Sequence, residues 1–167
     1  MIFEVWPDGR MDIGGRVVPC ALGRSGVLPA AEKREGDGFT PAGLWPIRRL
    51  LYRPDKGAPA TNLLAEAISP SDGWCDAADE RAYNRPVALP YPASAERMWR
   101  DDELYDLVVV LGHNDRPVVA GMGSAIFLHL RRPDGGPTEG CVALTRTDML
   151  DFLAKAGPDD LVRIHPV

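Results

Sequence analysis

The sequence predicts a single, mainly β domain over residues 1–167, with one helix near the C-terminus. Short runs of alternating apolar and polar residues recur along the chain, and this period of two is typical of strands with one buried face. Sixteen prolines and seventeen glycines are spread along the chain, as many turns between short strands require. The period of three to four residues that marks a helix is clear near the C-terminus.

The composition excludes several classes of protein. A chain of 167 residues that is 45% hydrophobic can form one core, and no stretch approaches the ~20 apolar residues of a membrane span. Acidic and basic residues are interleaved and the net charge is −5, which argues against a nucleic-acid partner. No His-x-x-x-His or Cys-x-x-Cys spacing occurs, so we predict no metal and no cofactor. We expect a monomer.

The N-terminal third is predicted to consist of strands joined by turns. Residues 2–6 form a strand, and Asp8 and Gly9 form a hairpin turn. A turn over residues 40–43 then precedes a strand over residues 45–52.

The segment 70–94 is rich in prolines and aromatic residues and is predicted to be irregular. An irregular segment of this length usually forms a lid or a binding rim in a compact domain. Its side chains either border a substrate groove or pin the loop to the core, and the sequence leaves both alternatives open. The residues concerned are Trp74, Tyr83, Asn84 and Arg85.

Two short elements precede the most hydrophobic part of the chain. Residues 63–68 form a strand or a short helix, and residues 94–100 begin with a helix start signal and form one helical turn. Residues 104–111 form a central strand that ends in a turn containing His113 and Asn114. His113 is either a second functional imidazole or a loop residue near the site, and Asn114 is a substrate-binding candidate beside it.

A strand over residues 124–130 carries the first candidate catalytic residue, His129. The Pro/Gly-rich segment 131–137 must turn the chain back, so Cys141 can lie beside the imidazole. A thiol and a histidine in contact are a nucleophile and its base, and an imidazolium would lower the pKa of the thiol. The alternative is a core histidine and a small buried cysteine.

The residues around the thiol extend this hypothesis. Gly140 lets backbone N–H groups approach a reacting carbonyl, so its surroundings are a candidate oxyanion site. Thr138 is the nearest side chain that can orient the histidine. Arg131 and Arg132 either pair with substrate carboxylates or are solvated turn residues.

The predicted helix covers residues 147–156. Thr145 and Asp148 form its capping box, and Gly157 and the following proline end it. Its apolar face is expected to pack beneath the loop that carries Cys141. Residues 161–164 form the last strand.

Three cysteines leave at least one unpaired. Cys20 and Cys75 can bridge in an oxidising compartment, which leaves Cys141 free, or both can be ordinary buried thiols. We favour the second alternative.

Two blocks of the sequence resemble the L,D-transpeptidase (YkuD) family of bacterial cell-wall enzymes. Residues 123–130 and 138–144 resemble its active-site signature, with the sequences Gly-Ser-Ala-Ile-Phe-Leu-His-Leu and Thr-Glu-Gly-Cys-Val-Ala-Leu. Residues 36–47 resemble its Thr-Pro-x-Gly-x-aromatic-x-Ile element. Together with the helix these blocks cover most of the chain, which looks most like a short, stand-alone proteobacterial branch of the family.

The resemblance implies a β-sandwich and an acyltransferase. Cys141 would be the acylated nucleophile, His129 the base, and the backbone from Glu139 to Cys141 the oxyanion site. The substrates would be peptidoglycan stem peptides, joined in 3-3 or 1-3 cross-links. A hydrolase that releases a wall-attached lipoprotein or trims stems, and a non-catalytic wall-binding module, are the alternatives. The resemblance also implies the periplasm, although the N-terminus shows no signal peptide, and acylation of Cys141 by carbapenems.

The chain departs from the commoner signature of the family. Leu130 stands where a glycine follows the histidine, Glu139 where histidine or glycine is usual, and Ala143 where arginine or asparagine is usual. The gap between the histidine and the cysteine is also short. A carboxylate at position 139 would oppose a thiolate unless its side chain points away.

Overall fold

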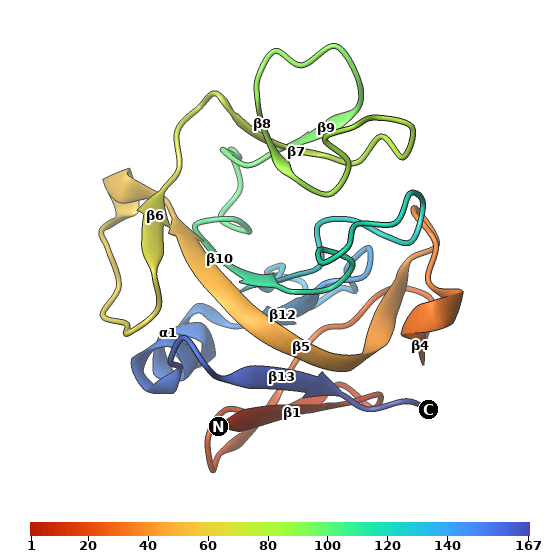
Figure 1. The fold of residues 1–167 in the computed structure, drawn as a ribbon. Coiled ribbons are helices and arrows are strands. Elements are labelled where there is room, and N and C mark those ends of the chain that lie inside the picture. Colours follow the sequence, from red (N-terminus) through yellow and green to blue (C-terminus); the bar gives the residue numbers. More distant parts are fainter.

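A long strand, β5 (Phe39–Tyr52), runs through the centre of the computed structural model, which describes residues 1–167 (Figure 1). It pairs with four other strands of the large sheet. These are β4 (Gly26–Pro29), β6 (Ala65–Ala67), β10 (Leu107–Leu111) and β13 (Leu161–Ile164). β5 therefore joins the half of the sheet that holds both termini to the half that holds β10 and the strands beyond it.

The terminal half of the sheet brings the two ends of the chain together (Figure 1). β1 (Ile2–Trp6) runs parallel to β13, with Phe3 opposite Val162. β2 (Arg10–Asp12) and β3 (Val17–Pro19) continue the sheet by antiparallel pairing. Gly9 makes the predicted turn between β1 and β2 with φ +83°.

The other half of the sheet carries the histidine and the cysteine singled out from the sequence. β10 pairs antiparallel with β11 (Phe127–Leu130), which pairs parallel with β12 (Val142–Leu144). Side chains alternate between two faces of these strands. Leu128 and Leu130 enter the main core, whereas Phe127 enters a second apolar cluster on the opposite face.

The only α-helix, α1 (Arg146–Lys155), lies against β11 and β12. Thr145 is its N-cap and accepts a hydrogen bond from the backbone N–H of Asp148, as predicted. Its buried face contains Met149, Phe152 and Leu153. The last helical residue is Lys155, and the cap residue Ala156 has an extended backbone. Gly157 does not adopt the positive φ of a glycine cap, so the predicted cap at this position is wrong.

A small three-stranded sheet lies above the large one (Figure 1). Its central strand β7 (Asp72–Cys75) pairs with β8 (Pro86–Ala88) and β9 (Ala95–Arg97). The prediction of a helical turn over 94–100 is therefore wrong. The strands β7 and β8 interrupt the predicted irregular segment 70–94, whose residues 76–85 and 89–94 do lie outside strands and helices. Cross-strand pairing, such as that of Trp74 with Glu96, overrides the local Pro-rich and helix-start signals.

The predicted turn over residues 40–43 is also wrong. These residues belong to β5, where parallel pairing with β4 sets Val27 opposite Thr40 and Pro29 opposite Ala42. The ambiguous segment 63–68 contains the strand β6. Two 3₁₀ turns, η1 (Ala30–Glu32) and η2 (Pro54–Lys56), complete the structure.

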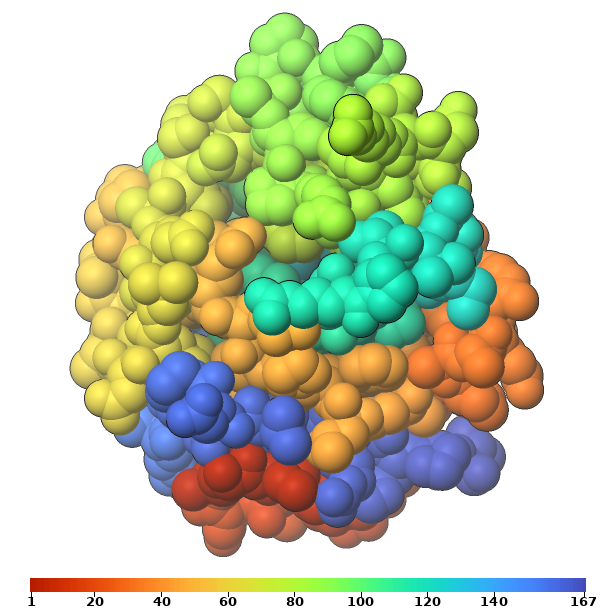
Figure 2. Space-filling view, in the orientation of Figure 1, coloured from red at the N-terminus to blue at the C-terminus, as the bar shows by residue number.

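The mainly β fold with one helix near the C-terminus is confirmed. Cys20, Cys75 and Cys141 are all buried and free. No helix has the length and apolarity that crossing a membrane requires. In Figure 2 the segment near residue 120, in cyan, lies between the small sheet, in green, and β5, in orange.

Candidate active site

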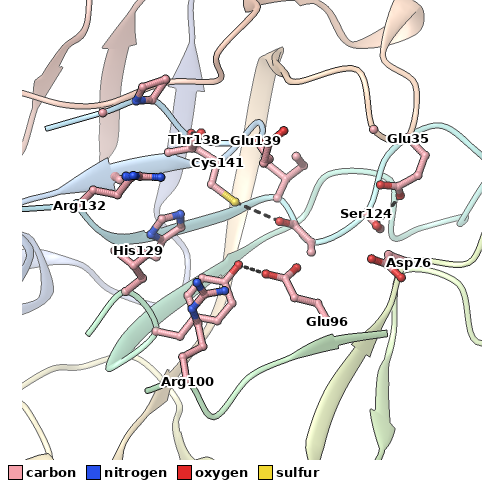
Figure 3. Close-up of a pocket in the computed structure, with 18 of the residues that line it drawn as sticks. Glu35, Asp76, Glu96, Arg100, Ser124, His129, Arg132, Thr138, Glu139 and Cys141 are labelled. Carbon is pink, nitrogen blue, oxygen red and sulfur yellow. Dashed lines mark hydrogen bonds between the residues drawn. The ribbon is translucent and has the colours of Figure 1, made fainter. Parts of the chain in front are cut away.

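A cavity of about 390 Å³ contains both Cys141 and His129 in its lining. Its walls come from the small sheet, the ends of β11 and β12, and loops that are distant in sequence (Figure 3). The residues that also line it include Lys33, Glu35, Asp76, Glu96, Arg100, Tyr105, Ser124, Ala125, Arg132, Thr138 and Glu139.

The pairing of β11 with β12 brings the thiol and the imidazole to the same face of the sheet. Leu128 lies opposite Val142 and His129 opposite Ala143. Cys141, which immediately precedes β12, therefore lies next to the strand residue Phe127. Figure 3 shows the side chains of Cys141 and His129 at the same cavity.

The Cys141 thiol is buried and hydrogen-bonded. Its Sγ donates to the carbonyl oxygen of Ala125 at 3.1 Å, and the N–H of Phe127 donates to the sulfur at 3.4 Å. Burial, together with a smaller contribution from the nearby Glu96 carboxylate, raises the pKa of the Cys141 thiol to about 12. The Cys141 side chain is therefore a neutral thiol at neutral pH.

The His129 imidazole is also neutral. Its Nδ1 lies 2.8 Å from the carbonyl oxygen of Leu130. Because a carbonyl only accepts hydrogen bonds, Nδ1 carries the ring proton, and Nε2 is left as a free base. Burial lowers the pKa of His129 to about 4, and its ring packs edge-on against Tyr105, with 5.3 Å between centroids.

This neutral pair differs from the imidazolium and thiolate expected from the sequence. In a buried site, desolvation disfavours the charged form of each group, so it raises the pKa of the thiol and lowers that of the imidazole. The largest cause of both shifts is burial. The two side chains therefore rest as a neutral thiol and a neutral imidazole, not as an ion pair.

The loop before Cys141 is held by Thr138. Its Oγ1 donates to the carbonyl oxygen of Cys141 at 2.6 Å and accepts from the N–H of Gly140 at 3.1 Å. Thr138 thus positions the cysteine rather than the histidine, whose orienting partner is Leu130. Gly140 has φ +140°, and a Cβ there would lie 2.8 Å from the carbonyl oxygen of Phe39, so this position requires glycine.

The backbone N–H groups of the loop differ in availability. The N–H of Gly140 is bonded to Thr138, whereas those of Glu139 and Cys141 have no hydrogen-bond partner. The candidate oxyanion donors are therefore the N–H groups of Glu139 and Cys141. The Glu139 side chain is 81% exposed and accepts from Arg24 Nε at 2.8 Å, so its carboxylate points away from the thiol.

Three predicted groove residues lie behind the site, not in its cavity. Trp74, Tyr83 and Asn84 are buried. Asn84 Oδ1 accepts from Trp74 Nε1 and from the N–H of Ala125, each at 3.0 Å. The bond to Ala125 holds this residue at φ +54°, a conformation that is uncommon for residues other than glycine. The carbonyl oxygen of Ala125 in turn accepts the hydrogen bond from the Cys141 thiol. Asn84 therefore contacts the site through Ala125.

Four of the remaining predicted binding residues lie outside the cavity lining, whereas Arg132 belongs to it. His113 is buried, bonds Met122 through Nε2 at 3.0 Å and packs on Trp45. Asn114 donates to the carbonyls of Val119 and Gly123, which folds its own loop. Arg85 is exposed, and Arg131 lines a neighbouring groove that shares Arg132 with the cavity.

Most of the polar residues that line the cavity are not marked by any pattern in the sequence. Glu35, Asp76, Glu96, Arg100, Tyr105 and Ser124 come from separate segments. Only the pairing of β7 with β9 brings Asp76 and Glu96 to the cavity, and no local motif marks that pairing.

Residues 2–164 match the family model YkuD, the L,D-transpeptidase catalytic domain. No curated protein matches the chain. Among solved structures, an L,D-transpeptidase from Mycobacterium smegmatis matches 98% of this chain and 58% of its own, with 11% sequence identity and a TM-score of 0.44. The chain thus spans little more than half the length of that protein chain.

Proposed function

The chain belongs to the L,D-transpeptidase catalytic domain family, and we propose that it is a peptidoglycan L,D-transpeptidase whose acyl-enzyme forms on Cys141. The observation that carries the proposal is the shared cavity of Cys141 and His129, in which the imidazole keeps a free Nε2. A nucleophile beside an oriented base is what acyl transfer through a thioester needs.

The first half of the reaction acylates the enzyme. His129 Nε2 takes the proton of the thiol as the sulfur attacks the carbonyl carbon of an amide in a donor stem peptide. The resulting oxyanion accepts hydrogen bonds from the backbone N–H groups of Cys141 and Glu139. The C–N bond then breaks, the imidazolium gives its proton to the leaving amine, and a thioester remains on Cys141.

The second half transfers the acyl group. His129 takes a proton from the amine of an acceptor stem as that nitrogen attacks the thioester carbonyl. The C–S bond breaks, the sulfur regains a proton from the imidazolium, and a new amide joins the two stems as a 3-3 or 1-3 cross-link. With water in place of the amine, the same residues would release a trimmed stem or a wall-attached lipoprotein. On this proposal, residues 1–167 act as a single catalytic domain on the cell wall in the periplasm.

Product analysis tests the proposed function. The protein is incubated with disaccharide tripeptides and tetrapeptides, and products are identified by mass and fragmentation. Dimers are expected with the native protein and with the control Cys20→Ala, and none with Cys141→Ala. Shortened stems without dimers would make the protein a hydrolase. Unchanged substrates would contradict catalysis on stems and favour an envelope-protein substrate or a wall-binding module.

A further inference from the structure

The side chain of Asn84 lies outside the cavity lining, yet it makes four hydrogen bonds behind the site. Its Oδ1 accepts from Trp74 Nε1 and from the N–H of Ala125, each at 3.0 Å. Its Nδ2 donates to the carbonyl oxygens of His113 at 3.1 Å and Asn114 at 2.7 Å. Since an amide side chain has two donors and two lone pairs, its whole capacity for hydrogen bonds is used.

The bonds of Asn84 form in the interior, where they join three segments of the chain. Asn84, Trp74 and Ala125 are all buried. The amide connects the strand β7, the loop that follows β10, and the residues just before β11. A buried amide is costly unless its polar atoms are paired, so these three segments must keep their positions around it.

Ala125 has a backbone conformation that needs such support. Its φ of +54° is left-handed, which is disfavoured for a residue with a side chain because Cβ approaches the following carbonyl oxygen. The N–H of Ala125 has Asn84 Oδ1 as its acceptor in this conformation. Without that acceptor, a buried N–H would be unpaired and the left-handed backbone would lose its support. The Ala125 peptide groups would then relax to a different orientation.

The carbonyl of Ala125 is one of two backbone groups that hold the sulfur of Cys141. The thiol donates to this carbonyl oxygen at 3.1 Å, and the N–H of Phe127 donates to the sulfur at 3.4 Å (Figure 3). Both groups belong to the same short segment of the chain. The direction in which the sulfur points into the cavity therefore depends on how Ala125 is held.

We propose that Asn84 is a positioning residue for the nucleophile: it holds Ala125 in the left-handed conformation, and the Ala125 carbonyl in turn fixes the sulfur of Cys141 in the cavity. This inference rests on the proposed function, since the same thiol is the proposed nucleophile.

The hydrogen bond to Ala125 is compatible with attack by the thiol. Rotation about the Cβ–Sγ bond turns the proton away from the carbonyl as His129 takes it, while the sulfur stays in place. The N–H of Phe127 remains on the sulfur and stabilises the thiolate. A displacement of about 1 Å at a reacting atom can lower a rate about 100-fold. Asn84 therefore affects turnover without touching the substrate.

The test uses Asn84→Gly, with Asn114→Gly as its matched control. Glycine suits the φ of +55° at position 84 and of +49° at position 114, so both variants remove an amide without straining the backbone. The Asn114 side chain bonds Val119 and Gly123 but neither Ala125 nor the sulfur. Thermal unfolding verifies that the variants are folded, and we expect both to be less stable than the native protein.

The first measurement is the S–H stretching band of Cys141 in the Raman spectrum, isolated by subtracting the spectrum of the same protein with Cys141→Ala. A thiol that donates to a carbonyl has a weakened S–H bond and a lower stretching frequency. We expect the band to move to higher frequency in Asn84→Gly and to keep its native position in Asn114→Gly. It should also stay in Asn84→Asp, because aspartate keeps an oxygen that can accept from Ala125.

The second measurement is turnover of muropeptides. In Asn84→Gly we expect kcat to fall about 10- to 100-fold, with KM changed less than about twofold because Asn84 does not line the cavity. In Asn84→Asp, kcat should return to within about threefold of the native value. A role in stability alone would not produce this separation of kcat from KM.

The Raman band separates this inference from the proposed function, because it needs no substrate. If the native protein does not turn over muropeptides, the proposed function fails, and a shifted band in Asn84→Gly would still support Asn84 as the residue that positions the thiol. A native band in folded Asn84→Gly, or an equal shift in Asn114→Gly, would overturn the inference. If Asn84→Gly does not fold, Asn84→Asp decides: a native band supports the inference and a shifted band overturns it.

Discussion

At the scale of single residues, burial decides the protonation states of Cys141 and His129, the proposed nucleophile and base. The Pro/Gly-rich turn between His129 and Cys141 predicts that the chain reverses and brings the two residues together, and both do line one cavity. It does not predict their charge. Their charge depends on burial, the largest cause of the shifts that raise the pKa of Cys141 to about 12 and lower that of His129 to about 4.

The neutral pair predicts a specific pH profile for alkylation of Cys141. Because the pKa of the thiol is raised, the thiolate fraction should increase about tenfold for each pH unit from 6 to 9, without levelling off. His129→Gln should leave this profile unchanged, since the resting imidazole is uncharged. The rate is measured with iodoacetamide and peptide mapping, which separates Cys141 from Cys20 and Cys75. A fast rate that is constant from pH 6 to 8 and is lost in His129→Gln would instead show a preformed imidazolium–thiolate pair.

At the scale of elements, local signals predicted the structure only where the element depends on its own sequence. The sequence predicts both ends of the helix α1 to within one residue, because Thr145 caps the helix and its apolar residues share one face. β7 and β9 were missed, because short strands gain their stability from partners distant in sequence. The same failure hid Asp76 and Glu96 from the predicted site.

The cap of α1 gives a prediction at this scale. Thr145→Ala removes the side chain that accepts from the N–H of Asp148 and should lower the free energy of unfolding by about 1 kcal/mol. Thr147→Ala, on the exposed face of the same helix, is the matched control and should change stability far less. Urea unfolding followed by circular dichroism measures both. Equal effects of the two substitutions would show that the cap does not stabilise the helix.

At the scale of the whole molecule, the two ends of the chain pair with each other and pack against the helix that supports the strands of the site. β1 pairs with β13, and Phe3 packs on Phe152 of α1 with 4.6 Å between ring centroids. α1 lies in turn against the strands that carry His129 and the residues after Cys141. No local pattern announces such contacts between residues about 150 positions apart, whereas the alternation along each strand and the turn residues do predict a mainly β fold.

A double-mutant cycle tests this closure. Phe3→Leu and Phe152→Leu should each lower the free energy of unfolding by about 1–3 kcal/mol, with a coupling of about 0.5–1.5 kcal/mol between them. Phe127 lies in the second apolar cluster, so Phe3→Leu and Phe127→Leu should be additive and serve as the control pair. Additivity of the first pair would show that β1 and α1 do not depend on each other.

The most direct test of the central claim, that Cys141 is the acylated nucleophile, is the intact mass of the protein after incubation with a carbapenem. We expect one adduct of the mass of the drug on the peptide that contains Cys141. The adduct should persist in Cys20→Ser and Cys75→Ser, be lost in Cys141→Ala, and form much more slowly in His129→Gln. An unchanged mass after long incubation, or an adduct located on Cys20 or Cys75, would contradict the account.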